Sequence, residues 1–211
     1  MPDAPPEHRQ LAAIMFTDMV DYSALAQRDQ SLALELLEEH RQVARSLFPR
    51  FNGTEIKTIG DAFLVEFHSA LEAAQCAIEI QRTLAKRNHD LAVDRRIEVR
   101  IGIHIGDVVH RGGDVYGDGV NIASRIQAVA GPGGICVSMD VERQIHNALK
   151  ARLKKLAPTE LKIFTCRWTC IGSCCHGKKA LNRRKLRALL AFGHGEKVYS
   201  AGLRPLSSCS P

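Results

Sequence analysis

Two aspartates at the ends of apolar segments are the first candidates for chemistry in this chain. Asp18 follows an apolar run that ends at Thr17, and Asp61 lies in a Gly-Asp turn between two β-branched stretches. The pattern around Asp61 is typical of a β-hairpin with the carboxylate at its tip. If the two segments are neighbouring strands, the carboxylates meet, and a hard divalent cation relieves their repulsion. Together they indicate a metal site, whereas each alone is typical of a turn or a helix cap.

A second group of polar candidates lies in residues 114–125. Asn121 and Arg125 are four residues apart in a segment with helical spacing, so they share one face of the helix. An arginine beside a metal-bound phosphate would stabilise the charge that develops on it. An asparagine one turn away would position a sugar by hydrogen bonds. Without the two aspartates, Arg125 would be interpreted as a solvated helix arginine.

The elements that must position these residues are predicted in the order β-α-β-β-α-β, followed by further elements. The predicted strands are 11–17, 54–59, 62–67, 96–109, 135–138 and 153–156, and the predicted helices are about 29–51, 69–86, 120–129 and 140–149. Residues 97–105 alternate between branched apolar and polar or small residues, which indicates one buried face. The order predicts an α+β fold with a ferredoxin-like βαββαβ core, an antiparallel sheet, and an extra C-terminal helix and strands. Both long helices are expected on one face, which leaves the other face for a ligand or a second copy.

Four ordered segments resemble the class III nucleotidyl cyclases, whose catalytic domains make 3′,5′-cyclic monophosphates from ATP or GTP. The matching segments are 15–23, 56–61, 99–106 and 114–125, and the resemblance covers about residues 10–161, the predicted catalytic domain. It implies that Asp18 and Asp61, with the Met19 backbone carbonyl, hold two Mg²⁺ or Mn²⁺ ions per site. The ribose 3′-oxygen would attack the α-phosphorus in line, and pyrophosphate would leave.

The resemblance also implies roles for the remaining candidates. Arg125 would stabilise the α-phosphate, Asn121 would orient the ribose, and Lys57 with Asp114 would read the base. A lysine can donate to adenine N1 and an aspartate can accept from the 6-amino group, whereas guanine presents the reverse, so ATP is the expected substrate. In the family, one subunit supplies the metal aspartates and the other supplies the base-reading pair and the arginine. The expected assembly is therefore a homodimer with two equivalent sites.

The overall composition suits one globular domain, with 45% hydrophobic and 25% charged residues among 211. The apolar runs are too short to span a bilayer. Residues 1–9 are acidic and proline-rich, so we expect a disordered N-terminus and no secretory signal. These features predict a cytoplasmic protein without a membrane span.

Residues 162–211 differ sharply in composition from the rest of the chain. They hold ten of the 29 Lys and Arg residues, one of the 23 Asp and Glu residues, and five of the seven cysteines. Domains of the family close with a Pro-Val-x-Val-Tyr strand, which is not found here. One permitted set of codons for residues 164–177 encodes a similar strand in another frame. We hypothesise that a one-base shift after about Lys162 replaced that strand with a basic, cysteine-rich, disordered tail.

Two other functions are compatible with such a tail. A cyclase-like domain without its last strand would bind nucleotide or dimerise but turn over poorly, because a sheet edge is exposed. The basic run Lys178–Arg187 would suit nucleic acid or acidic lipid, and the tail cysteines with His176 would suit zinc, although their spacing matches no familiar finger. A solvated tail without a specific nucleic-acid partner is the interpretation we favour.

Overall fold

The computed structural model of the chain describes residues 8–149, 153–155, 159–161, 164–166 and 168–171. The main sheet has the strand order β2-β3-β1-β4-β6-β10-β7, and β5 pairs with β4 beside this path. Its strands are β1 His8–Met19, β2 Thr54–Ile59, β3 Ala62–Phe67, β4 Val99–Arg111, β5 Asp114–Tyr116, β6 Ile135–Ser138, β7 Leu153–Lys155 and β10 Trp168–Ile171. The strands β8 Thr159–Leu161 and β9 Phe164–Cys166 form a separate two-stranded sheet.

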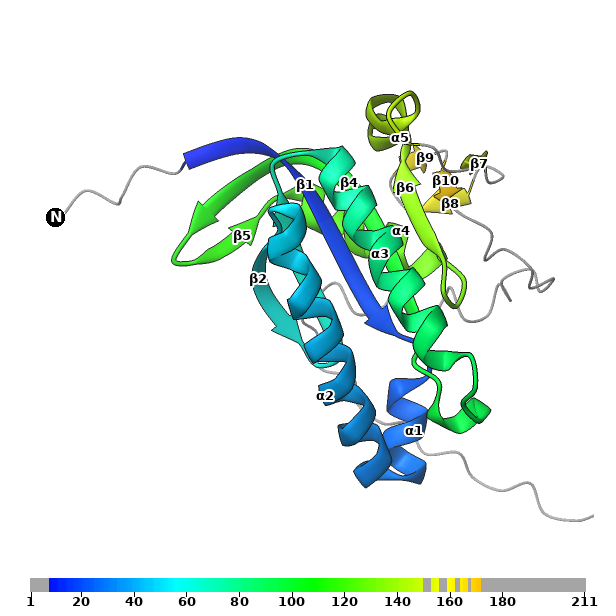
Figure 1. Cartoon of the computed structure of the whole chain (residues 1–211). Coiled ribbons are helices and arrows are strands. Elements are labelled where there is room, and N and C mark those ends of the chain that lie inside the picture. Colours follow the sequence, from blue (N-terminus) through cyan, green and yellow to red (C-terminus); the bar gives the residue numbers. More distant parts are fainter. Residues whose placement is uncertain (1–7, 150–152, 156–158, 162–163, 167, 172–211) are drawn as a thin grey trace, which may run out of the picture. The chain divides into compact units, whose positions relative to one another are not determined.

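Within the described residues, five α-helices accompany the main sheet. They are α1 Tyr22–Arg28, α2 Gln30–Leu47, α3 Ala70–Asn88, α4 Asp118–Val129 and α5 Met139–Ile145, with short 3-10 turns η1 Phe48–Phe51 and η2 Val93–Arg95. Figure 1 shows the two long helices, α2 and α3, on the same side of the sheet. The predicted α+β architecture with an antiparallel sheet is confirmed, and among the strands that the structure describes only β4 and β6 pair in parallel.

The centre of the sheet is β1, which pairs antiparallel with β3 on one side and with β4 on the other. In this register Ile14 lies opposite Glu66 of β3 and His104 of β4. The same register sets Asp18 directly opposite Arg100 of β4. The C-terminal end of β1 is therefore the place where the predicted metal site must form.

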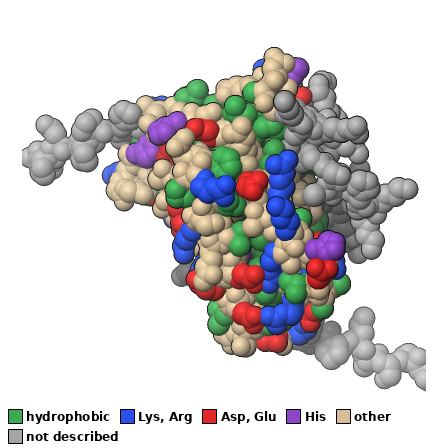
Figure 2. Space-filling model, in the orientation of Figure 1, with side chains coloured by type: hydrophobic (Ala, Val, Ile, Leu, Met, Phe, Trp, Pro, Cys, Tyr) green, Lys and Arg blue, Asp and Glu red, His purple; other side chains and the backbone are tan. Residues whose placement is uncertain are grey.

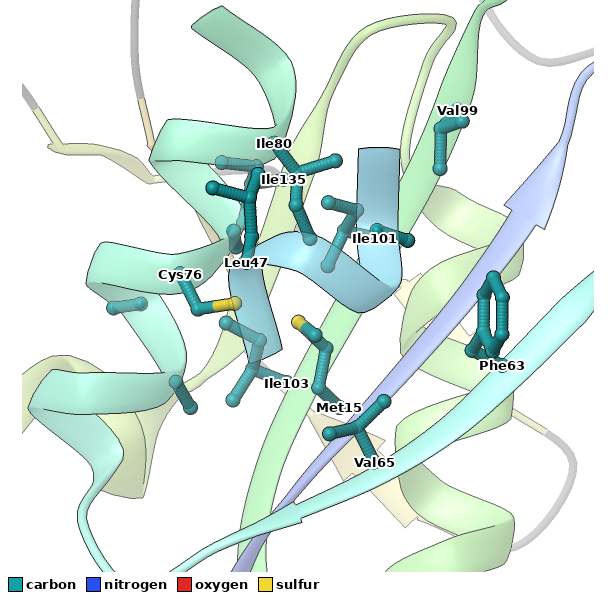
Figure 3. Packing of buried hydrophobic residues seen from close by; sticks show 14 of the residues in the cluster. Met15, Leu47, Phe63, Val65, Cys76, Ile80, Val99, Ile101, Ile103 and Ile135 are labelled. Carbon is teal, nitrogen blue, oxygen red and sulfur yellow. The ribbon is translucent and has the colours of Figure 1, made fainter. Parts of the chain in front are cut away.

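The main hydrophobic core lies between the sheet and the helices α2 and α3. Its strand residues occupy alternate positions, as the predicted period of two requires. Met15, Val65, Ile101 and Ile103 are fully buried on this face, and α3 contributes Ile80 (Figure 3). Helix α4 covers part of the opposite face of the sheet, so that face is only partly open.

Local capping residues explain where the helices begin. The Asp29 side chain accepts a hydrogen bond of 3.0 Å from the Leu32 N–H and starts α2, and the Ser69 side chain accepts from Leu71 and starts α3. The helix after β6 begins earlier than the predicted 140–149. Ser138 ends β6 in an extended conformation, and its hydroxyl accepts from Val141, so α5 begins one residue earlier.

The structure contains a strand, β10, beside β6, whereas the sequence analysis predicted that the closing strand is lost. β10 pairs antiparallel with β6, with Trp168 opposite Ser138, and also pairs with β7. Within the described residues, β6 is therefore an interior strand and not an exposed edge. The predictions of a disordered tail, a zinc site and a nucleic-acid surface concern residues that lie largely outside those described.

Charged side chains of both signs are interspersed over the face that carries α2 and α3 (Figure 2). Glu39 of α2 pairs with Arg87 of α3 at 2.5 Å, and Glu35 pairs with Arg95 of η2. Both pairs link neighbouring elements, and the Glu35–Arg95 pair, which is exposed, contributes little stability. Among the described residues, no helix combines the length and apolarity that crossing a bilayer would need.

Candidate active site

The carboxylates of Asp18 and Asp61 meet at the end of β1. Asp18 is the penultimate residue of β1, and Asp61 lies in the turn between β2 and β3. The Met19 backbone N–H donates a hydrogen bond of 2.9 Å to Asp61 Oδ2. Burial first, and then the negative charge of Asp18, raise the pKa of Asp61 above its ordinary value. The structure therefore brings all three predicted metal-site residues into one place.

The turn that presents Asp61 depends on Gly60. The hairpin has a two-residue loop, Gly60-Asp61, and Gly60 has a φ of +62°. A positive φ at the first loop position is required by a type II′ hairpin turn, and glycine adopts it without steric cost. Both strands of this hairpin have the bounds that the sequence predicts.

Two neighbours of Asp18 were not found from the sequence. Arg100 of β4 forms an ion pair with Asp18, and Gln127 of α4 donates to Asp18 Oδ2 at 3.4 Å. The Arg100 guanidinium is half-buried, and its Nε has no hydrogen-bond partner among the described residues. The sequence signal that could have identified Arg100 was its position on the polar face of a strand with alternating apolar and polar residues. Its pairing with Asp18 depends on the β1–β4 register, which one sequence does not reveal.

The predicted base-reading residues form an ion pair in the free protein. Lys57 Nζ of β2 lies 2.6 Å from Asp114 Oδ2 of β5, although these two strands are not paired with each other in the sheet. The hydrogen bond from Lys57 lowers the pKa of Asp114, and a hydrogen bond from the Val115 backbone N–H adds to this effect. Both side chains are partly exposed, so a planar ligand can reach them from solvent.

The other two predicted residues lie on α4 and do not contact the aspartates. Asn121 is exposed and Arg125 is half-buried. Within residues 8–149, no hydrogen bond or ion pair joins either side chain to Asp18 or Asp61. The helix packs closely on β4 because Gly102 lacks a side chain: a Cβ there would lie 2.2 Å from the Gln127 nitrogen. One chain thus carries two separate sets of candidate residues.

Comparison with known proteins identifies the family of this chain. Residues 5–170 match the adenylate and guanylate cyclase catalytic domain family. The chain belongs to this family. The match extends past the predicted boundary at residue 161 and includes most of β10.

Bacterial relatives of this cyclase domain include proteins named as adenylate cyclases. The putative adenylate cyclase 3 of Rhizobium meliloti (strain 1021) is 41% identical over 139 residues, which cover 65% of this chain and 24% of the relative. The adenylate cyclase of Streptomyces coelicolor is 35% identical over 119 residues, which cover 56% of this chain and 30% of the relative. The chain therefore spans less than a third of the length of either protein.

Solved structures share the fold of the cyclase domain. The crystal structure of an adenylate/guanylate cyclase/hydrolase from Silicibacter pomeroyi has a TM-score of 0.75 and 34% identity, and the match covers 80% of this chain and 99% of that chain. The adenylyl cyclase CyaB from P. aeruginosa has a TM-score of 0.69 at 18% identity, with 80% and 97% covered.

The donor atoms in this cyclase domain suit a hard divalent cation. The described residues contain no cluster of three or more His, Cys, Asp and Glu side chains placed to hold a metal. Asp18 and Asp61 are nevertheless two adjacent carboxylates, and their mutual repulsion is what a bound cation would relieve. Oxygen-only donors that leave positions for water and phosphate oxygens are the environment Mg²⁺ prefers.

Proposed function

We propose that this cyclase domain converts ATP to 3′,5′-cyclic AMP and pyrophosphate, in sites shared between the two subunits of a homodimer. The observation that carries the proposal is the meeting of Asp18 and Asp61 beside the Met19 backbone. Adjacent carboxylates repel each other, and a hard divalent cation is a common way of relieving that repulsion. Its presence at the end of a central strand indicates a site for a metal-bound phosphate ester.

The metal-site residues would hold two Mg²⁺ or Mn²⁺ ions. Asp18 and Asp61 would each supply carboxylate oxygens, and Met19 would supply its backbone carbonyl. Cations bound there would lower the pKa of the ribose 3′-OH and neutralise charge on the triphosphate. Arg100 holds the Asp18 carboxylate in the absence of a cation, so cation binding would have to displace this ion pair.

The reaction forms one bond and breaks one bond at the α-phosphorus. The 3′-hydroxyl loses its proton, its oxygen bonds to the α-phosphorus, and the bond to the bridging oxygen of pyrophosphate breaks. Arg125 would stabilise the negative charge on the α-phosphate during this step, and Asn121 would orient the ribose by hydrogen bonds. Neither residue needs to exchange a proton.

The pair of Lys57 and Asp114 supports ATP as the substrate. The lysine would donate to adenine N1, and the aspartate would accept from the 6-amino group. Their contact at 2.6 Å supports a role for both side chains at one edge of a base. Guanine would place a donor against the lysine and an acceptor against the aspartate, which leaves buried polar groups unmatched.

Sharing of sites between subunits is supported by the separation of the two residue sets. Within residues 8–149, no hydrogen bond or ion pair joins Asn121 or Arg125 to the aspartates of their own chain, yet the proposed in-line attack uses all four residues at one substrate. A twofold-symmetric dimer would bring α4 of one subunit to the aspartates of the other and produce two equivalent sites.

Turnover by the purified chain tests the proposal. We expect cyclic AMP to form from ATP and Mn²⁺, and Asp18→Asn or Asp61→Asn to reduce kcat by about 100-fold or more, the cost of removing a key electrostatic group. Asp29→Asn is the matched control, because asparagine also caps a helix and Asp29 is not one of the proposed site residues. Equal turnover by the Asp18 and control variants would exclude the proposed role of the carboxylates.

The alternative is a nucleotide-binding domain with little turnover. It rested on the loss of the closing strand, and the presence of β10 beside β6 weakens it. ATP binding without cyclic AMP formation in the same assay would favour it. Sequencing the gene separately tests the frameshift hypothesis, because codons that cannot encode the family's closing strand in another frame would exclude a shift.

A further inference from the structure

The helix α2 makes a direct contact with the turn that presents Asp61. Arg41 Nη2 donates a hydrogen bond of 3.0 Å to the backbone carbonyl of Gly60. Gly60 immediately precedes Asp61, so this carbonyl belongs to the peptide group that joins the two loop residues. Neither the metal site nor the base-reading pair uses Arg41.

The orientation of that peptide group determines where the Asp61 side chain points. Gly60 has a φ of +62°, whereas Asp61 is not among the residues with positive φ. Rotation of the peptide group would exchange the type II′ turn for a type I′ turn, in which both loop residues have positive φ. The Asp61 carboxylate would then leave the Met19 N–H, to which it now binds at 2.9 Å.

Arg41 is well placed to prevent this rotation, because α2 is fixed to the hairpin at other points. His40 is fully buried, and its ring centroid lies 5.4 Å from that of Phe63 in β3. Arg45, one turn further along α2, makes two hydrogen bonds of 2.9 Å to Glu55 of β2 and lies over the Phe63 ring. The helix therefore holds the hairpin strands through Arg45 and the hairpin turn through Arg41.

We propose that Arg41 is a positioning residue that locks the Gly60–Asp61 peptide group and so preorganises Asp61 for the cation. This inference rests on the proposed function, because it assigns Asp61 to a metal site. Arg41 touches neither substrate nor cation, and acts only through the backbone of the turn. Partners that orient a metal ligand in this way affect cation affinity more than fold stability.

Mn²⁺ binding to the 211-residue chain without nucleotide, measured by calorimetry, tests the proposal. We expect Arg41→Gln to weaken Mn²⁺ binding by about tenfold, the lower end of the range for such partners. Arg41→Lys, which keeps a donor, should recover part of the loss. Arg45→Gln is the matched control: it removes an arginine contact between α2 and the hairpin but leaves the turn untouched. It should lower the thermal midpoint and leave the Mn²⁺ affinity within about twofold of the wild-type value.

Hydrogen exchange of the Met19 amide, measured without metal by NMR, provides a second readout. Because this N–H donates to Asp61, we expect it to exchange about tenfold faster in Arg41→Gln than in Arg45→Gln. Unchanged exchange and affinity in Arg41→Gln would overturn the inference, as would equal losses in the Arg41 and Arg45 variants. If the wild-type chain binds no Mn²⁺, the proposed function fails and the exchange rates alone decide the role of Arg41.

Discussion

His40 is a histidine within the apolar core, and its surroundings make it sensitive to pH. It is 1% exposed, and neither ring nitrogen has a hydrogen-bond partner among the described residues. Burial, and to a lesser degree the charge of Arg41, lower the pKa of His40 to about 4. The native protein therefore keeps the ring neutral where an unfolded chain would already bind a proton.

This pKa shift predicts that stability falls on acidification. Above the unfolded pKa of about 6.5, the ring is neutral in both states and the native state has no penalty. Between pH 6.5 and 4 only the unfolded state binds the proton, so the free energy of unfolding falls by up to about 3 kcal/mol. Urea unfolding of wild type and His40→Leu at pH 7.5 and 4.5 measures the effect. The free energy of unfolding of His40→Leu relative to wild type should be higher at pH 4.5 than at pH 7.5. A difference that does not change with pH would contradict the lowered pKa of His40.

The proposed base-reading pair, Lys57 and Asp114, gives a second prediction at the level of single residues. Exchanging the polarity of the reading pair with Lys57→Glu and Asp114→Cys should move the preference toward GTP, because glutamate accepts from guanine N1–H. We expect the ratio of kcat/KM for ATP to that for GTP to fall by about 100-fold or more, as for other sites that reject a mismatched hydrogen-bonding group. Competition assays with both nucleotides measure this ratio. An unchanged ATP preference would show that other groups read the base.

Among contacts between single residues, the sequence predicted those that follow from the local order of strands and turns. The meeting of Asp18 and Asp61 could be predicted because a hairpin tip and a strand end define both positions. The Lys57–Asp114 pair was assigned only through family resemblance, since nothing local connects β2 with β5. Arg100 was missed because its partner is set by the register between β1 and β4, and Arg41 because its acceptor is a backbone carbonyl.

The packing of α4 on β4 depends on one glycine. A Cβ at Gly102 would lie 2.5 Å from the Ala123 carbonyl oxygen and 2.2 Å from the Gln127 nitrogen, both backbone atoms that cannot move without moving the helix. Gly102→Ala should therefore displace α4, with a loss of about 1–3 kcal/mol in the free energy of unfolding. It should also lower kcat, because α4 carries Asn121 and Arg125.

Gly131→Ala provides the control for this prediction. Nothing lies within 4 Å of a Cβ at Gly131, and its backbone is not in the left-handed region. Its thermal midpoint and kcat should stay close to those of wild type. Similar losses in both variants would show that glycine content, and not the β4–α4 contact, limits stability.

Elements with strong local signals were predicted well. The β2–β3 hairpin has the expected bounds, and α2 and α3 begin within one residue of the helices predicted at about 29–51 and 69–86. The elements that were missed are short or depend on distant pairing. The short strand β5 gains its partner from β4, and β10 is defined by hydrogen bonds to β6 and β7. Hydrophobic periodicity carries little information over three or four residues.

The whole assembly is where the two sets of site residues are expected to meet. Asp61→Asn alone and Arg125→Ala alone should each inactivate both sites of a homodimer. In a mixed dimer, one site would receive both mutations and the other would receive none. After subunit exchange of equal amounts, half of the dimers are mixed and each has one intact site, so we expect about a quarter of wild-type turnover. No recovery on mixing, with exchange verified by mass, would place the complete site within one chain.

The ion pair between Lys57 and Asp114 has a consequence for how a nucleotide enters. The Lys57 ammonium already donates to the Asp114 carboxylate. A base that binds both groups would therefore replace this bond and would not meet an unpaired donor and acceptor. The net affinity gained from the base edge is therefore reduced. A purine with mismatched donors and acceptors would break the Lys57–Asp114 bond and form no hydrogen bonds in its place. In the proposed site, discrimination would therefore come from the Lys57–Asp114 bond that a mismatched base breaks without replacing it.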